Sequence, residues 1–165
     1  IPDERVPLLE VVKSVIASLE RRAARRQMGI VLVDDRPSRP SRPVMYGFSD
    51  EINEVFHNLI ENAIKYGFEG TDIHIHISAR EAGHVRVCVT NTGEVIGENH
   101  LSRLTERFYR VDKARSRQIG GTGLGLAIVK HIVNRHRGTM EITSSDEGVT
   151  TFAVSLPVIA GQRAL

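Results

Sequence analysis

The stretch SDEINEVFHNLIENAIKYG, Ser49 to Gly67, carries an apolar stripe along its whole length. The stripe consists of Ile52, Val55, Phe56, Leu59, Ile60, Ala63 and Ile64. Residues spaced by three and four line one face of an α-helix, and a face this continuous packs on a sheet. The sequence therefore predicts a helix from about Ser49 to Tyr66, with Ser49 as its N-cap.

Four polar residues flank this stripe: Asn58, Asn62, Lys65 and Tyr66. Asn58 and Asn62 are four residues apart, so they are neighbours on the helix surface. An amide oxygen is a hard, neutral ligand that suits Mg²⁺, and a nearby lysine supplies a point charge for phosphate. The flank indicates either a magnesium and phosphate site or an ordinary polar edge of a helix.

Before this helix, the chain predicts one further helix and one strand. Apolar residues recur at helical spacing from Val6 to Leu19, and Gly29 is expected to end that helix. GIVLVDD then reads as a short buried strand. RPSRPSRPV, which contains three prolines, follows as an extended surface loop.

After the helix, the chain predicts a hairpin, a third helix and two last strands. DIHIHIS and HVRVCVT alternate with period two and form the hairpin. The third helix runs from Leu124 to about His136, and TMEITSS and TTFAVSLP are the last strands. The third helix should be held to the core by Leu124, Ile128, Ile132 and Val133. Three helices and a mixed, mostly antiparallel sheet predict a two-layer α+β sandwich.

The composition is that of an ordinary globular protein of 165 residues, 41% of them hydrophobic and 25% charged. We expect residues 1–165 to form one domain with its own core. The net charge of +2 is too small to indicate nucleic acid. Cys88 is the single cysteine, which excludes an internal disulfide. No apolar run approaches the roughly 18 to 20 residues that cross a bilayer.

A basic segment stands directly before a glycine-rich run. From Arg103 to Arg117 there are six basic residues and two acidic ones, Glu106 and Asp112, which leaves a local charge of +4. Such a segment is either a solvated loop or one that meets an anion.

The glycine-rich run is IGGTGLGLAIVK, Ile119 to Lys130. A dinucleotide fingerprint needs glycine at its first, third and sixth positions after a strand, and Gly121, Gly123 and Gly125 have another spacing. A P-loop needs Lys-Ser/Thr after its last glycine, where this chain has Leu126-Ala127. Exposed amides at a helix N-terminus favour an anion. A phosphate-facing lid is therefore favoured over a plain turn.

Together these segments resemble the nucleotide-binding domain of sensor histidine kinases, in the GHKL ATP-binding superfamily. HNLIENAIKYG resembles the N box, VTNTGEVI the first glycine box, RLTERFYRVD the phenylalanine box, GGTGLGLAIVKHIV the second glycine box and TTFAVSLP the closing strand. Their order and spacing agree over nearly the whole chain. The basic segment and second glycine box are especially similar to phosphate-regulon sensor kinases of the PhoR type.

The resemblance implies the Bergerat α/β sandwich, with ATP held between the helices and under a lid. It implies that Asn62 is the Mg²⁺ ligand and that Asn58 lines the site. Lys65 and Tyr66 would lie near the phosphates and ribose. Arg110 would contact phosphate and assist its transfer, which is mostly positioning and charge stabilisation.

The resemblance also implies an ATP lid over about residues 97–122, anchored by Phe108. The other implied nucleotide contacts are Asn91, Gly93 and Val95 in the first glycine box, Gly121, Thr122, Gly123, Leu124, Gly125 and Leu126 in the second, and Thr151 in the closing strand.

One position separates kinases from hydrolases within the superfamily. Gyrase-, Hsp90- and MutL-like ATPases carry a water-activating glutamate four residues before the metal-binding asparagine, where this chain has Asn58. An amide cannot act as a general base. Glu61 is adjacent to Asn62 in sequence but points about 100° away around the helix. The absence of the base favours a kinase.

The resemblance implies partners outside this chain. The acceptor histidine would lie on a separate dimerisation domain, from which phosphate passes to a response regulator. The chain should bind nucleotide as a monomer without phosphorylating itself. It would be the cytoplasmic part of a kinase anchored in the inner membrane, and would contact neither nucleic acid nor the membrane directly. Two other classes stay open: a degenerate domain (a pseudokinase) that serves as a protein-interaction module, and a GHKL ATPase.

Three positions depart from the family pattern. Asn91 replaces an aspartate that accepts from the adenine amino group, and its amide can accept the same bond without charge assistance. Val95 replaces a glycine, and a β-branched residue resists the positive φ that glycine allows. Val149 stands where the third glycine box has glycine, with Gly148 one place early. We expect weakened adenine binding from these changes.

Overall fold

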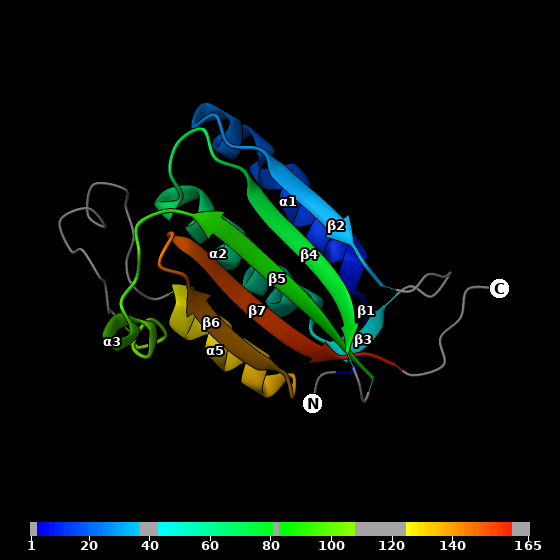
Figure 1. Cartoon of the computed structure of the whole chain (residues 1–165). Coiled ribbons are helices and arrows are strands. Elements are labelled where there is room, and N and C mark those ends of the chain that lie inside the picture. The colour runs from blue at the N-terminus through cyan, green and yellow to red at the C-terminus, as the bar shows by residue number, and fades with distance from the viewer. Residues whose placement is uncertain (1–2, 37–42, 81–82, 108–124, 160–165) are drawn as a thin grey trace.

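The structure is a computed structural model that describes residues 3–36, 43–80, 83–107 and 125–159. Its elements are β1 (Glu4–Pro7), α1 (Leu8–Arg25), β2 (Ile30–Asp34), β3 (Val44–Gly47), α2 (Ser49–Tyr66), β4 (Ile73–Arg80), β5 (His84–Thr92), α3 (Glu98–Leu101), α5 (Gly125–Arg135), β6 (Thr139–Ser144) and β7 (Val149–Pro157). Figure 1 shows them in one view. These elements confirm the predicted α+β sandwich.

The main sheet has five strands in the order β2-β4-β5-β7-β6. Only β2 and β4 are parallel, and the other neighbouring pairs are antiparallel. The predicted hairpin is therefore confirmed as β4 and β5, and the two predicted last strands as β6 and β7. β2 was predicted to be buried, which is wrong, because it lies at the sheet edge and leaves Val31 38% and Val33 43% exposed.

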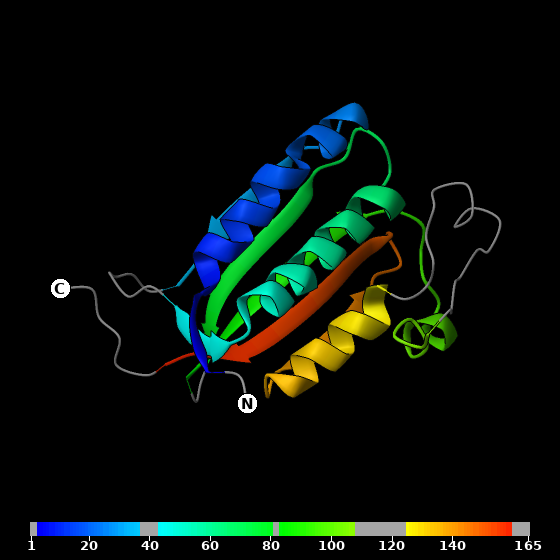
Figure 2. The same ribbon diagram turned by 180° about the vertical axis from the view of Figure 1, so that it is seen from behind.

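The helices α1, α2 and α5 lie side by side on one face of this sheet (Figure 2). α2 is the middle helix and packs against both α1 and α5. It spans the predicted bounds, and all seven residues of its stripe are buried. The N-cap residue is Phe48, without a side-chain cap bond, and Ser49 is the first helical residue. The prediction of Ser49 as N-cap is therefore wrong.

The first helix ends earlier than predicted. α1 ends at Arg25, and Gln27, with φ 55°, takes the left-handed conformation that we expected Gly29 to supply. The Met28 amide donates to the Ala23 carbonyl and the Gln27 amide to the Ala24 carbonyl. This pair of bonds is a Schellman motif, which satisfies the last carbonyls of the helix.

The third helix packs through two of the predicted residues, Ile132 and Val133, and through Val129 where Ile128 was predicted. Val129, Ile132 and Val133 are buried, whereas Ile128 is 37% exposed. Val129 is one turn before Ile132 and Val133, so it shares their face, and Ile128 lies about 100° away from it. Leu124, which we also expected at this contact, lies outside the described residues.

A second, two-stranded sheet was not predicted. β1 and β3 are four-residue antiparallel strands that pair from Glu4 with Gly47 to Pro7 with Val44. β3 leads directly into α2, and a buried histidine fixes this junction. The Phe48 amide donates to His136 Nε2 over 3.1 Å, so the other ring nitrogen carries the proton that bonds the Ile132 carbonyl at 2.8 Å.

Among the described residues, no helix is both long enough and apolar enough to cross a membrane. The opposite face of the main sheet carries no helix within the same ranges (Figure 1). Of the predicted lid, residues 97–107 are described and contain the short helix α3.

Candidate functional site

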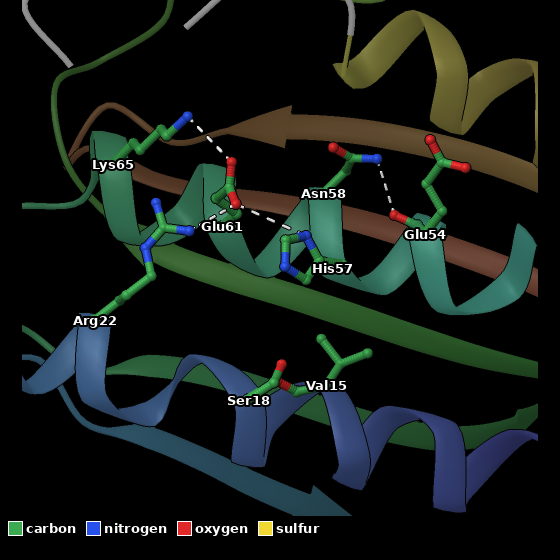
Figure 3. A network of polar contacts seen from close by, with 8 residues as sticks. All are labelled: Val15, Ser18, Arg22, Glu54, His57, Asn58, Glu61 and Lys65. Carbon is green, nitrogen blue, oxygen red and sulfur yellow. Dashed lines mark hydrogen bonds and ion pairs between the residues drawn. The ribbon is translucent and has the colours of Figure 1, made fainter. Parts of the chain in front are cut away.

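Asn58 lies on the edge of α2 that faces α5. Figure 3 shows its side chain directed away from α1, and its Nδ2 donates to the carbonyl of Glu54 over 2.9 Å. Its Oδ1 lies 3.2 Å from the place where a Cβ on Gly125 would be. The first turn of α5 therefore reaches Asn58. A larger residue at position 125 would displace the Asn58 amide by a few tenths of an ångström.

Asn62 follows Asn58 by one turn of α2 and is half-buried. Within the described part of the chain, no hydrogen bond joins its side-chain amide to another group. A half-buried amide without a protein partner retains its oxygen for a ligand. This chemistry fits Mg²⁺, which prefers hard oxygen ligands and keeps several waters.

Lys65 stands at the end of the same helix and pairs with Glu61. The Lys65 Nζ lies 3.1 Å from Glu61 Oε1, and Arg22 of α1 donates to Glu61 Oε2 over 2.8 Å. His57 Nδ1 lies 3.7 Å from the same Oε2 (Figure 3). Burial of the Glu61 carboxyl raises its pKa, but the bonds from Lys65 and Arg22 outweigh this effect and hold the pKa below its ordinary value.

The position of Glu61 decides what its carboxylate can do. Its partners lie on α1 and on the outer surface of α2, and Asn62 points about 100° away around the helix. Lys65 lies between the two directions, about 40° from Glu61 and about 60° from Asn62. A rotation of the Lys65 side chain can therefore bring its ammonium from Glu61 toward an anion beside Asn62. The Glu61 carboxylate stays about 100° away from Asn62 around the helix, where Arg22 holds it.

Asn91 lies where the C-termini of α2 and β5 meet. It is 6% exposed and continues the buried face of β5. A Cβ on Gly67 would lie 3.6 Å from Asn91 Cβ, and one on Gly93 would lie 3.4 Å from its Nδ2. No hydrogen bond to the Asn91 amide exists among the described residues. A buried amide without a protein partner can accept a hydrogen bond from a ligand through its oxygen.

Val95 does not take the conformation that we expected to cause strain. The non-glycine residues with positive φ in the described ranges are Gln27 and Arg137, so Val95 has ordinary backbone geometry. Its side chain is 55% exposed. The expectation of strain is therefore wrong: the chain follows a path here that a β-branched residue can adopt.

The predicted Thr151 does not share a sheet face with Asn91. Thr151 bonds Thr90 through their hydroxyls, 3.1 Å apart, on the face opposite the helices. Thr150 pairs with Asn91 across the strands and is 3% exposed on the helix side. The sequence could have shown that Thr150 faces the helices, because alternate residues of a strand share a face and Thr150 is two residues before the apolar Phe152.

Six of the predicted site residues lie outside the described ranges: Phe108, Arg110, Gly121, Thr122, Gly123 and Leu124. The structure does describe Gly125 and Leu126, which begin α5, with Leu126 packed against the core. Tyr66 is half-buried in the last position of α2. The described part of the site thus runs from α5, across Asn58, Asn62 and Lys65, to Asn91.

A three-helix layer on this sheet, with an amide-lined flank on its middle helix, defines a Bergerat-type α/β sandwich. The profile of the family described as histidine kinase-, DNA gyrase B-, and HSP90-like ATPase matches residues 47–160. The chain belongs to this family.

Relatives agree with this assignment. The phosphate regulon sensor protein PhoR of Pseudomonas aeruginosa is 47% identical over 106 residues, 64% of this chain and 24% of that protein. The sensor-like histidine kinase SenX3 of Mycolicibacterium smegmatis is 47% identical over 100 residues, 61% of this chain and 26% of that protein. These relatives confirm the predicted resemblance to PhoR-type kinases. The chain spans about a quarter of their length.

Solved structures show the same fold. The mycobacterial sensor histidine kinase MprB superposes with a TM-score of 0.80 at 23% identity, over 94% of this chain and 97% of that one. At this identity the likeness concerns the fold, and it confirms the arrangement of the sheet and its three helices.

Proposed function

We propose that this chain is the ATP-binding catalytic domain of a two-component sensor histidine kinase, with residues 1–165 forming one domain. It binds Mg-ATP and donates the γ-phosphoryl group to a histidine on a separate dimerisation domain, for relay to a response regulator. The complete kinase is anchored in the membrane, and this domain is monomeric on its cytoplasmic side.

The proposed roles follow the motifs and the described contacts. Asn62 holds Mg²⁺, which would offset phosphate charge when bound, and Asn58 lines the metal side of the site. Lys65 and Arg110 bind and orient phosphate. The remaining proposed contacts are Tyr66, Asn91, Gly93, Val95, Phe108, Gly121, Thr122, Gly123, Leu124, Gly125 and Leu126, under a lid of about residues 97–122. Thr151 is left out of this set because its hydroxyl bonds Thr90 on the face opposite the helices.

The observation that supports the proposal is that, within the described ranges, no carboxylate stands in the position of a general base beside Asn62. One turn earlier the chain has Asn58, whose amide cannot take a proton from water. The adjacent carboxylate, Glu61, is bonded to Lys65 and Arg22 on another side of α2. This arrangement favours transfer to an external acceptor over hydrolysis.

Calorimetric titration with ADP, in the presence and in the absence of Mg²⁺, tests this proposal. Asn62→Ala should weaken Mg-dependent binding by at least about 10- to 100-fold, the range for losing a group that only supports a metal ligand. Asn53→Ala is the matched control, because Asn53 is an exposed residue of the same helix. Equal affinity of wild type and Asn62→Ala would remove Asn62 from its role.

Labelled ATP then separates the function classes. With γ-phosphate-labelled ATP, the chain alone should incorporate no label, and addition of a cognate phosphoacceptor domain should give a labelled histidine. Steady release of phosphate by the chain alone would favour an ATPase instead. Failure to bind Mg-nucleotide even at millimolar concentration would favour a non-catalytic interaction module.

A further inference from the structure

α2 ends differently from the other long helices, and its last carbonyls are satisfied from outside. The left-handed residues Gln27 and Arg137 close the ends of α1 and α5. Gly67, which follows α2, is extended with φ −70° and ψ 153°, and its amide reaches only the Ala63 carbonyl. The next carbonyls of a helix then need another donor.

Arg26, the residue after α1, supplies that donor. Its Nη1 donates to the carbonyl of Ile64, to that of Gly67 over 2.8 Å and, more weakly, to that of Lys65 over 3.4 Å. A guanidinium at this point also complements the negative end of the α2 dipole. The carbonyl of Arg26 accepts from the Gly70 amide at 3.1 Å, so Arg26 holds the segment after α2 from both sides.

The segment that Arg26 holds joins the two halves of the proposed nucleotide site. On one side it carries Lys65 and Tyr66. On the other it pairs with the end of β5, where Gly67 and Gly93 form a bridge and the Phe68 amide donates to the Thr92 carbonyl over 2.8 Å.

The packing in this segment leaves little freedom. A Cβ on Gly93 would lie 2.6 Å from the Tyr66 carbonyl oxygen, and one on Gly67 would lie 2.6 Å from Met28 Cε and 3.6 Å from Asn91 Cβ. A shift of the α2 terminus would therefore move Tyr66 and Asn91 relative to each other.

We propose that Arg26 is a positioning residue of the nucleotide site, which fixes the spacing between Lys65 and Tyr66 and the base-side residue Asn91. This inference rests on the proposed function. Arg26 acts through the α2 terminus and touches no ligand, so its loss should weaken binding of the base and of the phosphates together.

The test compares Arg26→Gln with Arg25→Gln, which removes the same charge from an exposed neighbour in the last turn of α1. The ligands are Mg-ADP and adenosine, titrated by calorimetry and by NMR, and circular dichroism checks that each variant is folded. We expect Arg26→Gln to weaken both ligands by about tenfold, which is about 1.4 kcal/mol of binding free energy lost through the displaced α2 terminus. Arg25→Gln should stay within about twofold of wild type.

The outcomes separate the possibilities. Wild-type affinity of folded Arg26→Gln would overturn the inference and leave the proposed function standing. Weakening of Mg-ADP alone would also overturn it, because that pattern belongs to a direct phosphate contact. Should Arg26→Gln not fold, Arg26→Lys replaces it: weakening of both ligands supports the inference, and unchanged affinities overturn it. A wild-type chain that binds no Mg-ADP would refute the proposed function and this inference with it.

Discussion

Glu61→Gln should lower the stability of the protein and at the same time tighten its binding of Mg-nucleotide. Glu61 is the carboxylate that pairs with Lys65 and Arg22. A neutral amide at this position releases both cations. Release removes two ion pairs from the folded state, but it frees Lys65 for the phosphates, so the two effects have opposite signs.

The expected sizes follow from the exposure of the three side chains. Lys65 and Glu61 are 21% and 23% exposed and Arg22 is 44% exposed, so each pair belongs to the partly exposed class that contributes about 0.2–1 kcal/mol. The variant should therefore lose about 0.5–1.5 kcal/mol, or about 1–6 °C in Tm for a chain of this length. Mg-nucleotide affinity should rise by up to about fivefold, since Lys65 no longer has to leave a partner that is worth at most about 1 kcal/mol.

The pH dependence gives an independent check of the same ion pairs. The pKa of Glu61 is lowered in the folded protein from its ordinary value of 4.5. Its contribution to stability is therefore fully present above pH 4.5 and is lost as the pH falls through the lowered pKa. The stability difference between wild type and Glu61→Gln should be constant near neutral pH and disappear in acid.

Urea unfolding and Mg-ADP titration on the same preparations measure both effects. Glu54→Gln is the control, because Glu54 is an exposed carboxylate on α2 that has no ion pair with a described residue. A tightening of the same size in Glu54→Gln would show a general effect of net charge. A fall in affinity in Glu61→Gln would refute the reasoning, because Glu61 would then hold Lys65 in the position that binds phosphate.

Two further predictions concern the base side of the site and the core. Asn91→Asp should tighten Mg-ADP binding about fivefold in calorimetry, because a charge-assisted bond to the adenine amino group is stronger than a neutral one; flat or weaker binding would remove Asn91 as the base reader. His136→Phe keeps a ring but leaves the Phe48 amide without its acceptor, so urea unfolding should show a loss of about 1–3 kcal/mol. An unchanged midpoint would show that this bond contributes nothing.

The sequence predicted α2 and its polar flank because both depend on local geometry. The stripe from Ile52 to Ile64 has no interruption, and Gly67 follows it, so period and end signal agree. The separation of Glu61 from Asn62 follows from the turn per residue alone. These properties depend on the local sequence and on the geometry of the helix.

The errors arise where tertiary position decides. β2 has the apolar composition of a buried strand, but it has a neighbour on one side only, and sequence does not show which strand becomes the edge. β1 and β3 have four residues each, too few to show alternation. The role of Arg26 depends on contacts with residues 38 to 41 positions away, which a basic run in α1 does not indicate.

The three departures from the family pattern, at Asn91, Val95 and Val149, affect the structure differently. Val95 is exposed and has no positive φ, so its replacement of glycine leaves the backbone unstrained. Gly148 has φ 82° and packs closely on Gly93: a Cβ added at position 148 would lie 2.1 Å from the Gly93 carbonyl oxygen. The Gly93 amide also donates to the Gly148 carbonyl over 2.8 Å. Gly148, the residue before Val149, therefore allows the backbone to approach Gly93 closely although position 149 is not glycine. Of these three positions, Asn91 is the one whose replacement changes a hydrogen-bonding group, because an amide stands in place of a carboxylate. We therefore propose that a weakness of adenine binding caused by these departures originates at Asn91.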